Sequence, residues 1–231
     1  MGRVHSIETM GAVDGPGLRM VVFLQGCPLR CRYCHNPDTW AAAGGEERSS
    51  EEIAAWAKRY KRFFGREGGV TFSGGEPLLQ ADFVLDCVEA LHKEGVHCAL
   101  DTGAGLWNER AQQLFDAVDL VILDVKHSDE AGFHRLTGGK IETLEQALAH
   151  LRATQKPTWV RQVIVDGYTQ SVEQVRALKE KIAGIYATKI ELLPYHTLGV
   201  HKWEALGIPY ALQDVQPPSP QTMEALRAAL K

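Results

Sequence analysis

Three cysteines lie within eight residues of one another, in the run Cys27-Pro28-Leu29-Arg30-Cys31-Arg32-Tyr33-Cys34. Such crowding can bring three sulfur atoms to one metal centre, because thiolates are ligands for zinc and for iron–sulfur clusters. A four-iron cluster held by three thiolates has one iron without a protein ligand. An open position of this kind separates a reactive metal centre from one that only stabilises a fold. The spacing therefore favours a metal centre that takes part in chemistry over one that only stabilises the fold.

Two other uses of these cysteines need weighing. Disulfides are disfavoured because the group is odd in number and no secretory leader is expected before it. A structural zinc site made of the three cysteines and His35 stays open, although such sites usually draw their ligands from two separated pairs. Cys87 and Cys98 fall in an expected helix and an expected strand, where a thiol acts as a small hydrophobe. We expect neither to bind the metal.

The composition is that of an enzyme with its own hydrophobic core. The chain has 231 residues, of which 45% are hydrophobic, so it can bury a core without help from a metal. Without an internal repeat or a long linker, residues 1–231 are expected to form a single domain. The net charge of −4 and the lack of a basic run disfavour a nucleic-acid partner. With no apolar segment suited to a leader or membrane span, we expect a cytoplasmic protein without membrane contacts. We also expect a monomer.

Strand and helix patterns alternate along the chain and must position these residues. Apolar runs predict parallel strands at 20–25, 69–73, 96–100, 120–124, 160–165 and 190–193. Amphipathic spacing predicts helices at 51–64, 77–93, 109–117, 144–153, 172–183 and 221–230. Helix starts are indicated at Ser49 with Glu52, Thr143 with Gln146, Ser171 with Gln174, and Ser219-Pro220. Six strands rather than eight predict an α/β fold of the partial (β/α)6 barrel type, with helices outside.

Residues suited to chemistry recur near the carboxyl ends of the predicted strands, where ligands bind in such sheets. In chain order they are Cys27, Gly74-Gly75-Glu76, Asp101-Thr102, Asp124 with Lys126, Arg161 and His196. Any one of them alone is explained by a solvated turn or cap. Six strands with such residues in the same position indicate one shared site.

These motifs together resemble a known family. The run from Gln25 to Asn36 resembles the cluster loop of radical S-adenosylmethionine (SAM) enzymes, in particular the activating enzymes of glycyl-radical enzymes such as pyruvate formate-lyase. The resemblance continues nearly end to end through residues 13–19, 73–77, 123–126, 192–196 and 201–203. It implies a radical SAM partial barrel with a [4Fe-4S] cluster on Cys27, Cys31 and Cys34.

The resemblance also implies the reaction. SAM would bind the open iron and be cleaved reductively to methionine and a 5′-deoxyadenosyl radical, which abstracts a hydrogen atom from a glycine of pyruvate formate-lyase (formate C-acetyltransferase). Residues 36–69 lack the extra cysteines of many related activases, which favours the pyruvate formate-lyase type. An activase of another glycyl-radical enzyme, a radical SAM enzyme for a small molecule, and a zinc or electron-transfer protein stay as alternatives. Flavodoxin is the electron donor expected by analogy.

Further site residues follow from the resemblance. The residues expected to contact SAM are Tyr33, Cys34, His35, Gly74, Gly75, Glu76, Asp124, Val125, Lys126, Arg161 and His196. Asp101, Thr102 and Asp124 would hold a monovalent cation, K⁺ or Na⁺; a plain hydrogen-bond network is the alternative. Arg161 fits equally a core ion pair and a group facing SAM.

Three local features near these motifs have more than one reading. Asp14 is our candidate for gripping the loop of the partner enzyme, or else it stabilises its own turn. Pro194 and Gly199 disfavour a helix that would pair His196 with His201, and His201 receives no role. We expect Gly103-Ala104-Gly105 to be a loop rather than a dinucleotide-binding motif.

Overall fold

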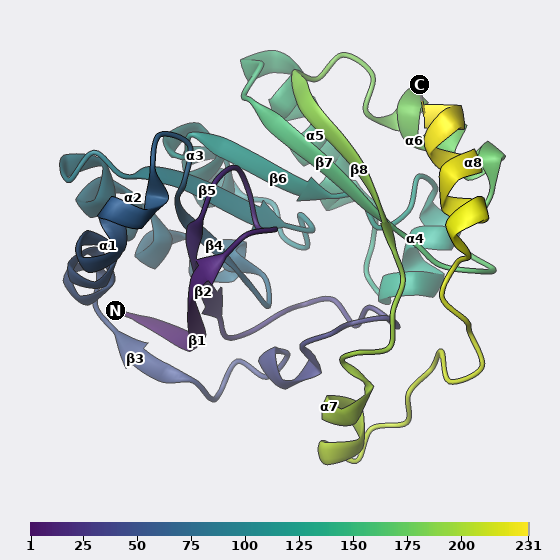
Figure 1. Cartoon of the computed structure of the whole chain (residues 1–231), viewed down its shortest axis with the longest axis horizontal. Helices are drawn as coiled ribbons and strands as arrows, with labels where there is room; N and C mark the ends of the chain where they lie inside the picture. Colours follow the sequence, from purple (N-terminus) through teal and green to yellow (C-terminus); the bar gives the residue numbers. More distant parts are fainter. Residues whose placement is uncertain (231) are drawn as a thin grey trace.

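The computed structural model describes residues 1–230, which form one curved sheet with helices outside it (Figure 1). The strand order is β3-β1-β2-β4-β5-β6-β7-β8, and neighbours from β2 onward are parallel. These six strands are β2 (Arg19–Leu24), β4 (Gly69–Gly74), β5 (His97–Thr102), β6 (Leu120–Asp124), β7 (Thr158–Ile164) and β8 (Ala187–Pro194). All six predicted strands are confirmed, as is the fold class.

Helices follow most of the parallel strands. They are α1 (Ser50–Phe64), α2 (Ala81–Lys93), α3 (Glu109–Ala117), α4 (Glu130–Thr137), α5 (Glu142–Thr154), α6 (Val172–Lys181), α7 (Val200–Ala205) and α8 (Pro220–Leu230), with short 3-10 turns η1 (Pro37–Thr39) and η2 (Pro77–Gln80). The predicted helix over 77–93 is thus η2 followed by α2. Cys87 in α2 and Cys98 in β5 are fully buried, as expected.

Three of the four predicted helix starts are present. Ser49 forms the reciprocal capping box of α1, and the hydroxyls of Ser171 and Ser219 each accept a backbone hydrogen bond at the start of α6 and α8. The start predicted at Thr143 is wrong, because α5 begins one residue earlier, at Glu142, after Ile141. Ile141 has no side-chain oxygen to cap the helix, and its own amide donates to the carboxylate of Glu130 in α4 at 3.0 Å.

Two strands of the structure, β1 and β3, were not predicted from the sequence. β1 (Gly2–Gly11) pairs antiparallel with β2, and β3 (Glu46–Arg48) pairs antiparallel with the start of β1. β1 alternates buried and exposed positions but has few large apolar residues, as suits a strand near the sheet edge. Both strands extend the sheet beyond β2.

Two helices were also missed. α4 begins where the Asp129 carboxylate accepts from the Gly132 amide, and it ends at Gly138, which has a φ of 69°. The second is α7, which begins at Val200 directly after Gly199 and contains His201. The expectation that no helix pairs His196 with His201 is confirmed. His196 lies outside α7, and the two histidines do not share a helix.

The interior of the sheet and the layer under the helices are apolar. Strands β2, β4, β5 and β6 are buried along almost their whole length. The segment Gly103-Ala104-Gly105 is a loop, as expected. No helix within residues 1–230 is long and apolar enough to cross a membrane.

Candidate active site

A cavity of about 500 Å³ opens at the carboxyl ends of the parallel strands. Its wall contains nearly all the residues selected from the sequence: Asp14, Cys27, Cys31, Tyr33, Cys34, His35, Gly74, Gly75, Glu76, Asp101, Asp124, Lys126, Arg161 and His196. Val125 and Thr102 lie behind that wall. Val125 is fully buried, and its amide donates to the Arg161 carbonyl at 2.8 Å. The fold thus brings together residues that are up to 182 positions apart in the sequence, from Asp14 to His196.

The loop that contains the cysteines rests on α4. The amides of Arg30 and Arg32 donate to the carbonyls of Thr137 and Leu136, at 2.7 and 2.9 Å. These carbonyls belong to the last turn of α4, which has no partners for them within the helix. The cysteine loop therefore satisfies the end of α4, and α4 holds the loop in place.

A second support comes from α7, which sequence reasoning gave no role. The indole nitrogen of Trp203 donates to the Cys34 carbonyl at 2.8 Å. The ammonium of Lys202 donates to Asn36 and pairs with Asp38, each at 2.9 Å. Only the proximity of residues 201–203 to the other motifs of the chain could have indicated this role.

The three thiols fit a polynuclear iron centre. Burial raises the pKa of Cys27 and of Cys31 to about 12, and also raises the pKa of Cys34. A positively charged metal centre would favour the thiolates in this place. Sulfurs that share one tetrahedral zinc lie about 3.8 Å apart. The sulfurs of Cys27, Cys31 and Cys34 do not all lie within 4.8 Å of one another. They are therefore spaced more widely than the ligands of a single zinc ion.

Gly74 and Gly75 let the chain turn closely beneath the cysteine loop. Gly74 has a φ of 109°, and a Cβ atom on Gly75 would lie 2.1 Å from the carbonyl oxygen of Gly26. The Glu76 amide donates to that same oxygen at 2.8 Å. The approach needs glycine, and it fixes the spacing between the end of β4 and the cysteines.

The Glu76 carboxylate ties three segments together. It is 1% exposed, and it accepts from the Thr102 hydroxyl at 2.5 Å, the Gly105 amide at 3.0 Å and the Leu78 amide at 3.3 Å. Burial raises the pKa of Glu76, and these hydrogen bonds oppose that rise. The side chain is a structural brace for the cavity wall as well as part of it.

Three buried polar atoms of the cavity residues have no hydrogen-bond partner among the described residues: the Tyr33 hydroxyl, Asp124 Oδ1 and His196 Nδ1. Unpaired buried polar atoms are costly, so their gathering in one cavity indicates a polar ligand. The ammonium of Lys126 pairs with Asp124 and lies 5.5 Å from the centre of the Tyr33 ring. The donor and acceptor set suits a ligand with amino, carboxylate and hydroxyl groups, as SAM has.

Two histidines form an aromatic platform at one side. The rings of His35 and His196 stack with their centres 4.0 Å apart and 15° between their planes. His35 Nε2 donates to the His196 carbonyl at 3.1 Å. Burial, and then the charge of His196, lower the pKa of His35, which favours a neutral ring.

Arg161 links the far wall of the cavity to the loop containing Asp14. Its guanidinium lies 3.8 Å from Asp101 and 3.4 Å from Glu191, and it donates to the Val13 carbonyl. Arg161 is both an ion-pair partner and part of the cavity wall.

The Asp14 carboxylate makes no hydrogen bond to its turn within the described chain, and burial raises the pKa of Asp14.

Two of the three expected cation ligands, Thr102 and Asp101, are engaged with other groups. The Thr102 hydroxyl donates to Glu76 and accepts from the Ala104 amide at 2.9 Å. Asp101 accepts from the Ser73 hydroxyl at 2.9 Å, and burial raises its pKa. Ser73 is a cavity residue that sequence reasoning did not single out.

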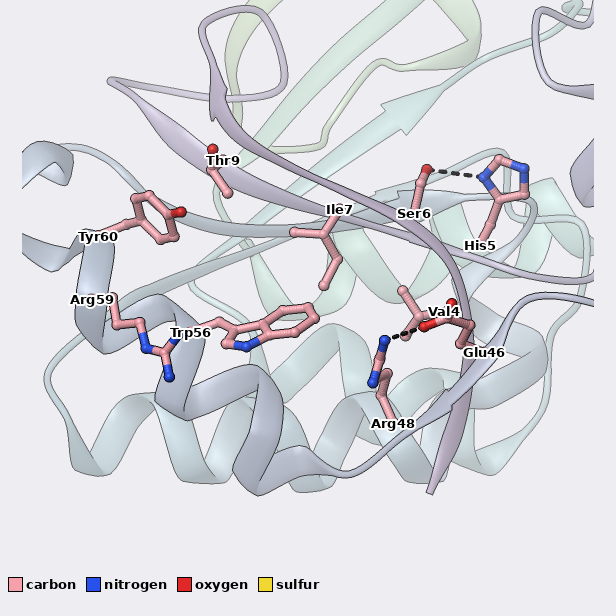
Figure 2. A pocket seen from close by; sticks show the side chains of 10 residues that line it. All are labelled: Val4, His5, Ser6, Ile7, Thr9, Glu46, Arg48, Trp56, Arg59 and Tyr60. Carbon is pink, nitrogen blue, oxygen red and sulfur yellow. Dashed lines mark hydrogen bonds and ion pairs between the residues drawn. The ribbon is translucent and has the colours of Figure 1, made fainter.

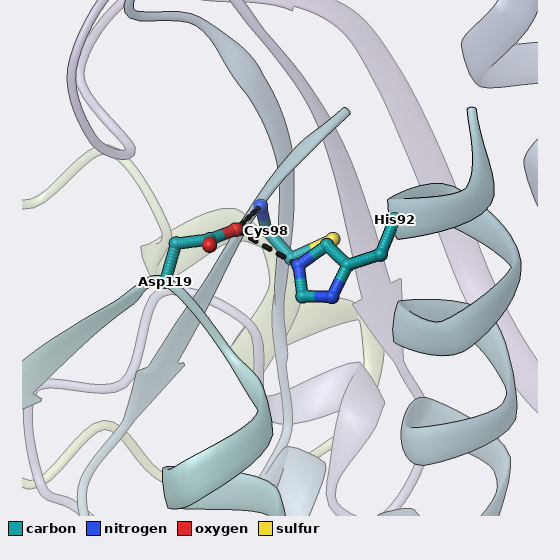
Figure 3. Close-up of side chains that lie close together, drawn as sticks. All are labelled: His92, Cys98 and Asp119. Carbon is teal, nitrogen blue, oxygen red and sulfur yellow. Dashed lines mark hydrogen bonds and ion pairs between the residues drawn. The ribbon is translucent and has the colours of Figure 1, made fainter. Parts of the chain in front are cut away.

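Two other features lie outside this cavity. A hollow of about 520 Å³ lies between β1, β3 and α1 and is lined by Ile7 and Trp56 among others (Figure 2). None of its lining residues lines the candidate active site. Figure 3 shows His92, Cys98 and Asp119, whose potential metal-ligating atoms lie within 4.8 Å. There Asp119 Oδ2 already accepts from the Cys98 amide and from His92, at 2.7 and 3.0 Å. This trio is a satisfied hydrogen-bond network.

The sequence profile of the Radical SAM superfamily matches residues 21–181. The chain belongs to the Radical SAM superfamily. Solved structures with the same fold include a domain of a pyruvate-formate lyase-activating enzyme from Bacteroides vulgatus, with a TM-score of 0.58, 24% identity, and coverage of 71% of this chain and 92% of that one. SuiB of Streptococcus suis bound to its precursor peptide has a TM-score of 0.64 at 15% identity, covering 77% of this chain and 39% of that one.

Within the superfamily, this chain falls among the pyruvate formate-lyase-activating enzymes. The protein of that name from Clostridium pasteurianum is 46% identical over 100% of this chain and 98% of its own length. The one from Staphylococcus aureus is 42% identical, covering 97% and 93%. The family implies a [4Fe-4S] cluster, SAM and a glycyl-radical enzyme as substrate.

Proposed function

We propose that this chain activates pyruvate formate-lyase by generating its glycyl radical. The observation that carries the proposal is the single cavity shared by three cysteines, a glycine-lined turn and three unpaired buried polar atoms. When bound, the [4Fe-4S] cluster supplies the electron that cleaves SAM to methionine and the 5′-deoxyadenosyl radical, which takes a hydrogen atom from a glycine of the partner. Cys27, Cys31 and Cys34 would hold the cluster.

The remaining cavity residues would bind and orient SAM. Backbone carbonyls at Gly74 and Gly75 can accept from its ammonium, since glycine allows a close approach. Lys126, held by Asp124, can bind its carboxylate, and Tyr33 offers a free hydroxyl nearby. The other expected contacts are His35, Glu76, Val125, Arg161 and His196, with Glu76 and Val125 acting through the backbone or by packing because their side chains are enclosed.

Asp14 is proposed as the contact for the glycine loop of the partner. Its half-buried carboxylate faces the cavity without a partner in its own turn, so it can accept from backbone amides of an entering loop. Arg161 supports this role, because it binds the carbonyl of the neighbouring Val13. Substituting Asp14 by Asn should therefore weaken activation of the partner more than cleavage of SAM.

A monovalent cation, K⁺ or Na⁺, is proposed at Asp101, Thr102 and Asp124. The support is an oxygen-only donor set beside Asp124 Oδ1, which has no partner. We further propose a single domain, a monomer in the cytoplasm, and flavodoxin as the donor of the electron.

The decisive experiment is electron paramagnetic resonance of pyruvate formate-lyase after anaerobic mixing with this protein, SAM and dithionite. A glycyl-radical signal is expected, together with 5′-deoxyadenosine among the products. SAM cleavage without a glycyl signal would instead indicate another glycyl-radical enzyme or a small-molecule substrate. No SAM cleavage by a protein with a loaded cluster would refute the proposal.

A further inference from the structure

We propose that three exposed arginines, Arg30, Arg32 and Arg135, form the docking surface for an acidic electron-donor protein. We refer to these three residues as the arginine patch. The proposal rests on the proposed function, because a donor is needed only if a cluster must be reduced. The patch lies on the outer face of the cysteine loop and on the adjoining α4.

The patch lies directly beside one cysteine of the loop. Arg30 and Arg32 flank Cys31 in the sequence, and both are exposed while Cys31 is 8% exposed. One peptide unit separates each arginine from this ligand. Electron transfer between proteins slows steeply with distance, so a donor seated here would have a short path to the cluster.

The side chains of the patch are held in position. Arg32 donates to the Tyr168 hydroxyl at 3.1 Å, and the Arg135 guanidinium lies 4.4 Å from the centre of the same ring. Arg135 also donates to the Gly167 carbonyl at 2.7 Å. Arg30 donates to the Cys27 carbonyl at 2.7 Å and lies 5.1 Å from the centre of the Trp40 ring. Ordered guanidinium groups lose little freedom when they bind carboxylates.

The charges of the patch are not neutralised within the protein. None of the three arginines has a carboxylate within 4.0 Å in residues 1–230. Asp129, Asp166 and Arg135 line a further surface hollow beside α4, distinct from the one in Figure 2, but Asp129 caps α4 and Asp166 accepts from the Gly167 amide. In a chain of net charge −4, these three arginines without a carboxylate partner would attract an acidic partner.

The patch is separate from the opening expected to receive the glycine loop. The arginines do not line the cavity, whereas Val13, Asp14 and His196 do. A donor on the patch would therefore leave the cavity accessible. The electron donor and the glycyl-radical enzyme could bind at the same time.

The test is stopped-flow reduction of the reconstituted cluster by reduced flavodoxin, and separately by reduced ferredoxin, at low and high salt. The variants are Arg32→Glu and Arg135→Glu, with Arg59→Glu on α1 as the matched control. For at least one donor, each patch variant should lower the second-order rate constant at low salt by about tenfold or more, and high salt should remove the difference. The control should keep the wild-type rate.

Reduction by dithionite, a small reductant, separates this proposal from the proposed function. SAM cleavage with dithionite should be the same in wild type, Arg135→Glu and Arg59→Glu. Unchanged donor rates in both patch variants would overturn the docking surface. If the wild-type protein cleaves SAM with dithionite but neither flavodoxin nor ferredoxin reduces its cluster, the proposed function stands and the docking surface is refuted.

Discussion

The Trp203 indole donates a 2.8 Å hydrogen bond to the carbonyl oxygen of Cys34, a residue 169 positions earlier in the chain. Trp203 also packs edge-on against Trp40, with ring centres 5.0 Å apart, and is 4% exposed. The short helix α7 thereby anchors the last cysteine of the loop. The position of the sulfur of Cys34 depends on a segment that is not part of the cysteine motif.

The Trp203→Phe variant tests this anchor. The substitution keeps an aromatic ring but leaves the Cys34 carbonyl without its donor, which should cost about 1–3 kcal/mol of the free energy of unfolding. We expect the loaded protein to lose iron faster than wild type. The decay of the visible absorbance of the cluster measures this loss. Trp107→Phe is the control, because the Trp107 indole makes no hydrogen bond within residues 1–230. Equal iron loss in both variants would contradict the anchoring role.

The Gly75→Ala variant tests the close approach of β4 to the cysteine loop. Its Cβ would lie 2.1 Å from the Gly26 carbonyl oxygen, so the backbone must shift beneath Cys27. We expect iron and sulfide content after reconstitution to fall well below the wild-type content. Gly167→Ala, at φ 73° with nothing within 4 Å, should cost about 1–2 kcal/mol for its backbone but keep full iron content. Full loading of Gly75→Ala would show that the loop tolerates displacement.

The Glu76→Gln variant tests the buried brace. An amide has one acceptor oxygen and turns its NH₂ group toward the Thr102 hydroxyl or a backbone amide, so at least one donor loses its partner. Unfolding free energy should drop by about 1–3 kcal/mol, and the KM for SAM should rise because the Gly74-Gly75 turn is less firmly held. Glu89→Gln on the exposed face of α2 should leave the KM for SAM unchanged and alter the unfolding free energy far less than Glu76→Gln does, because it loses only an exposed ion pair with Lys93. An unaltered KM would assign Glu76 to stability alone.

His97 should make stability depend on pH. Its Nδ1 accepts from the guanidinium of the buried Arg19 at 3.2 Å, and burial, followed by the charge of Arg19, lowers the pKa of His97 below 6.5. The unfolded chain then binds a proton that the folded chain does not, so stability falls as pH drops through 6.5. His97→Asn keeps an acceptor without the titration. Urea midpoints at about pH 8 and about pH 5.5 should differ less in this variant than in wild type; identical differences would exclude His97 as the source.

Substitutions of two cysteines, Cys31 and Cys87, distinguish a cysteine that binds the cluster from one that only packs in the core. Cys31→Ala should abolish both cluster loading and SAM cleavage, because only two thiolates remain. Cys87→Ala should retain both, since Cys87 is buried in α2 away from the cavity. Anaerobic iron and sulfide analysis with a SAM-cleavage assay measures the difference. Zinc without iron in the wild-type protein would return the structural zinc site to consideration.

Much of this site could be predicted from the sequence, because the patterns that define it lie within short segments of the chain. The buried parallel strands are continuous apolar runs, such as residues 120–123 of β6, and a run of that kind needs no distant partner to be recognised. The cysteine spacing and the Gly74-Gly75-Glu76 turn are equally local. Because parallel strands end at the same edge of a sheet, the sequence alone also placed Asp124 and His196 on one side of the fold.

The tertiary structure alone decided the contacts between segments that carry no strong pattern. α4 has only eight residues and α7 only six, too short for a clear helical period, yet both hold the cysteine loop. The arginine patch also joins Arg32 to Arg135 through Tyr168, residues far apart in the chain. Such pairings depend on how the sheet curves and where its helices pack, and these are properties of the whole chain that no local spacing records.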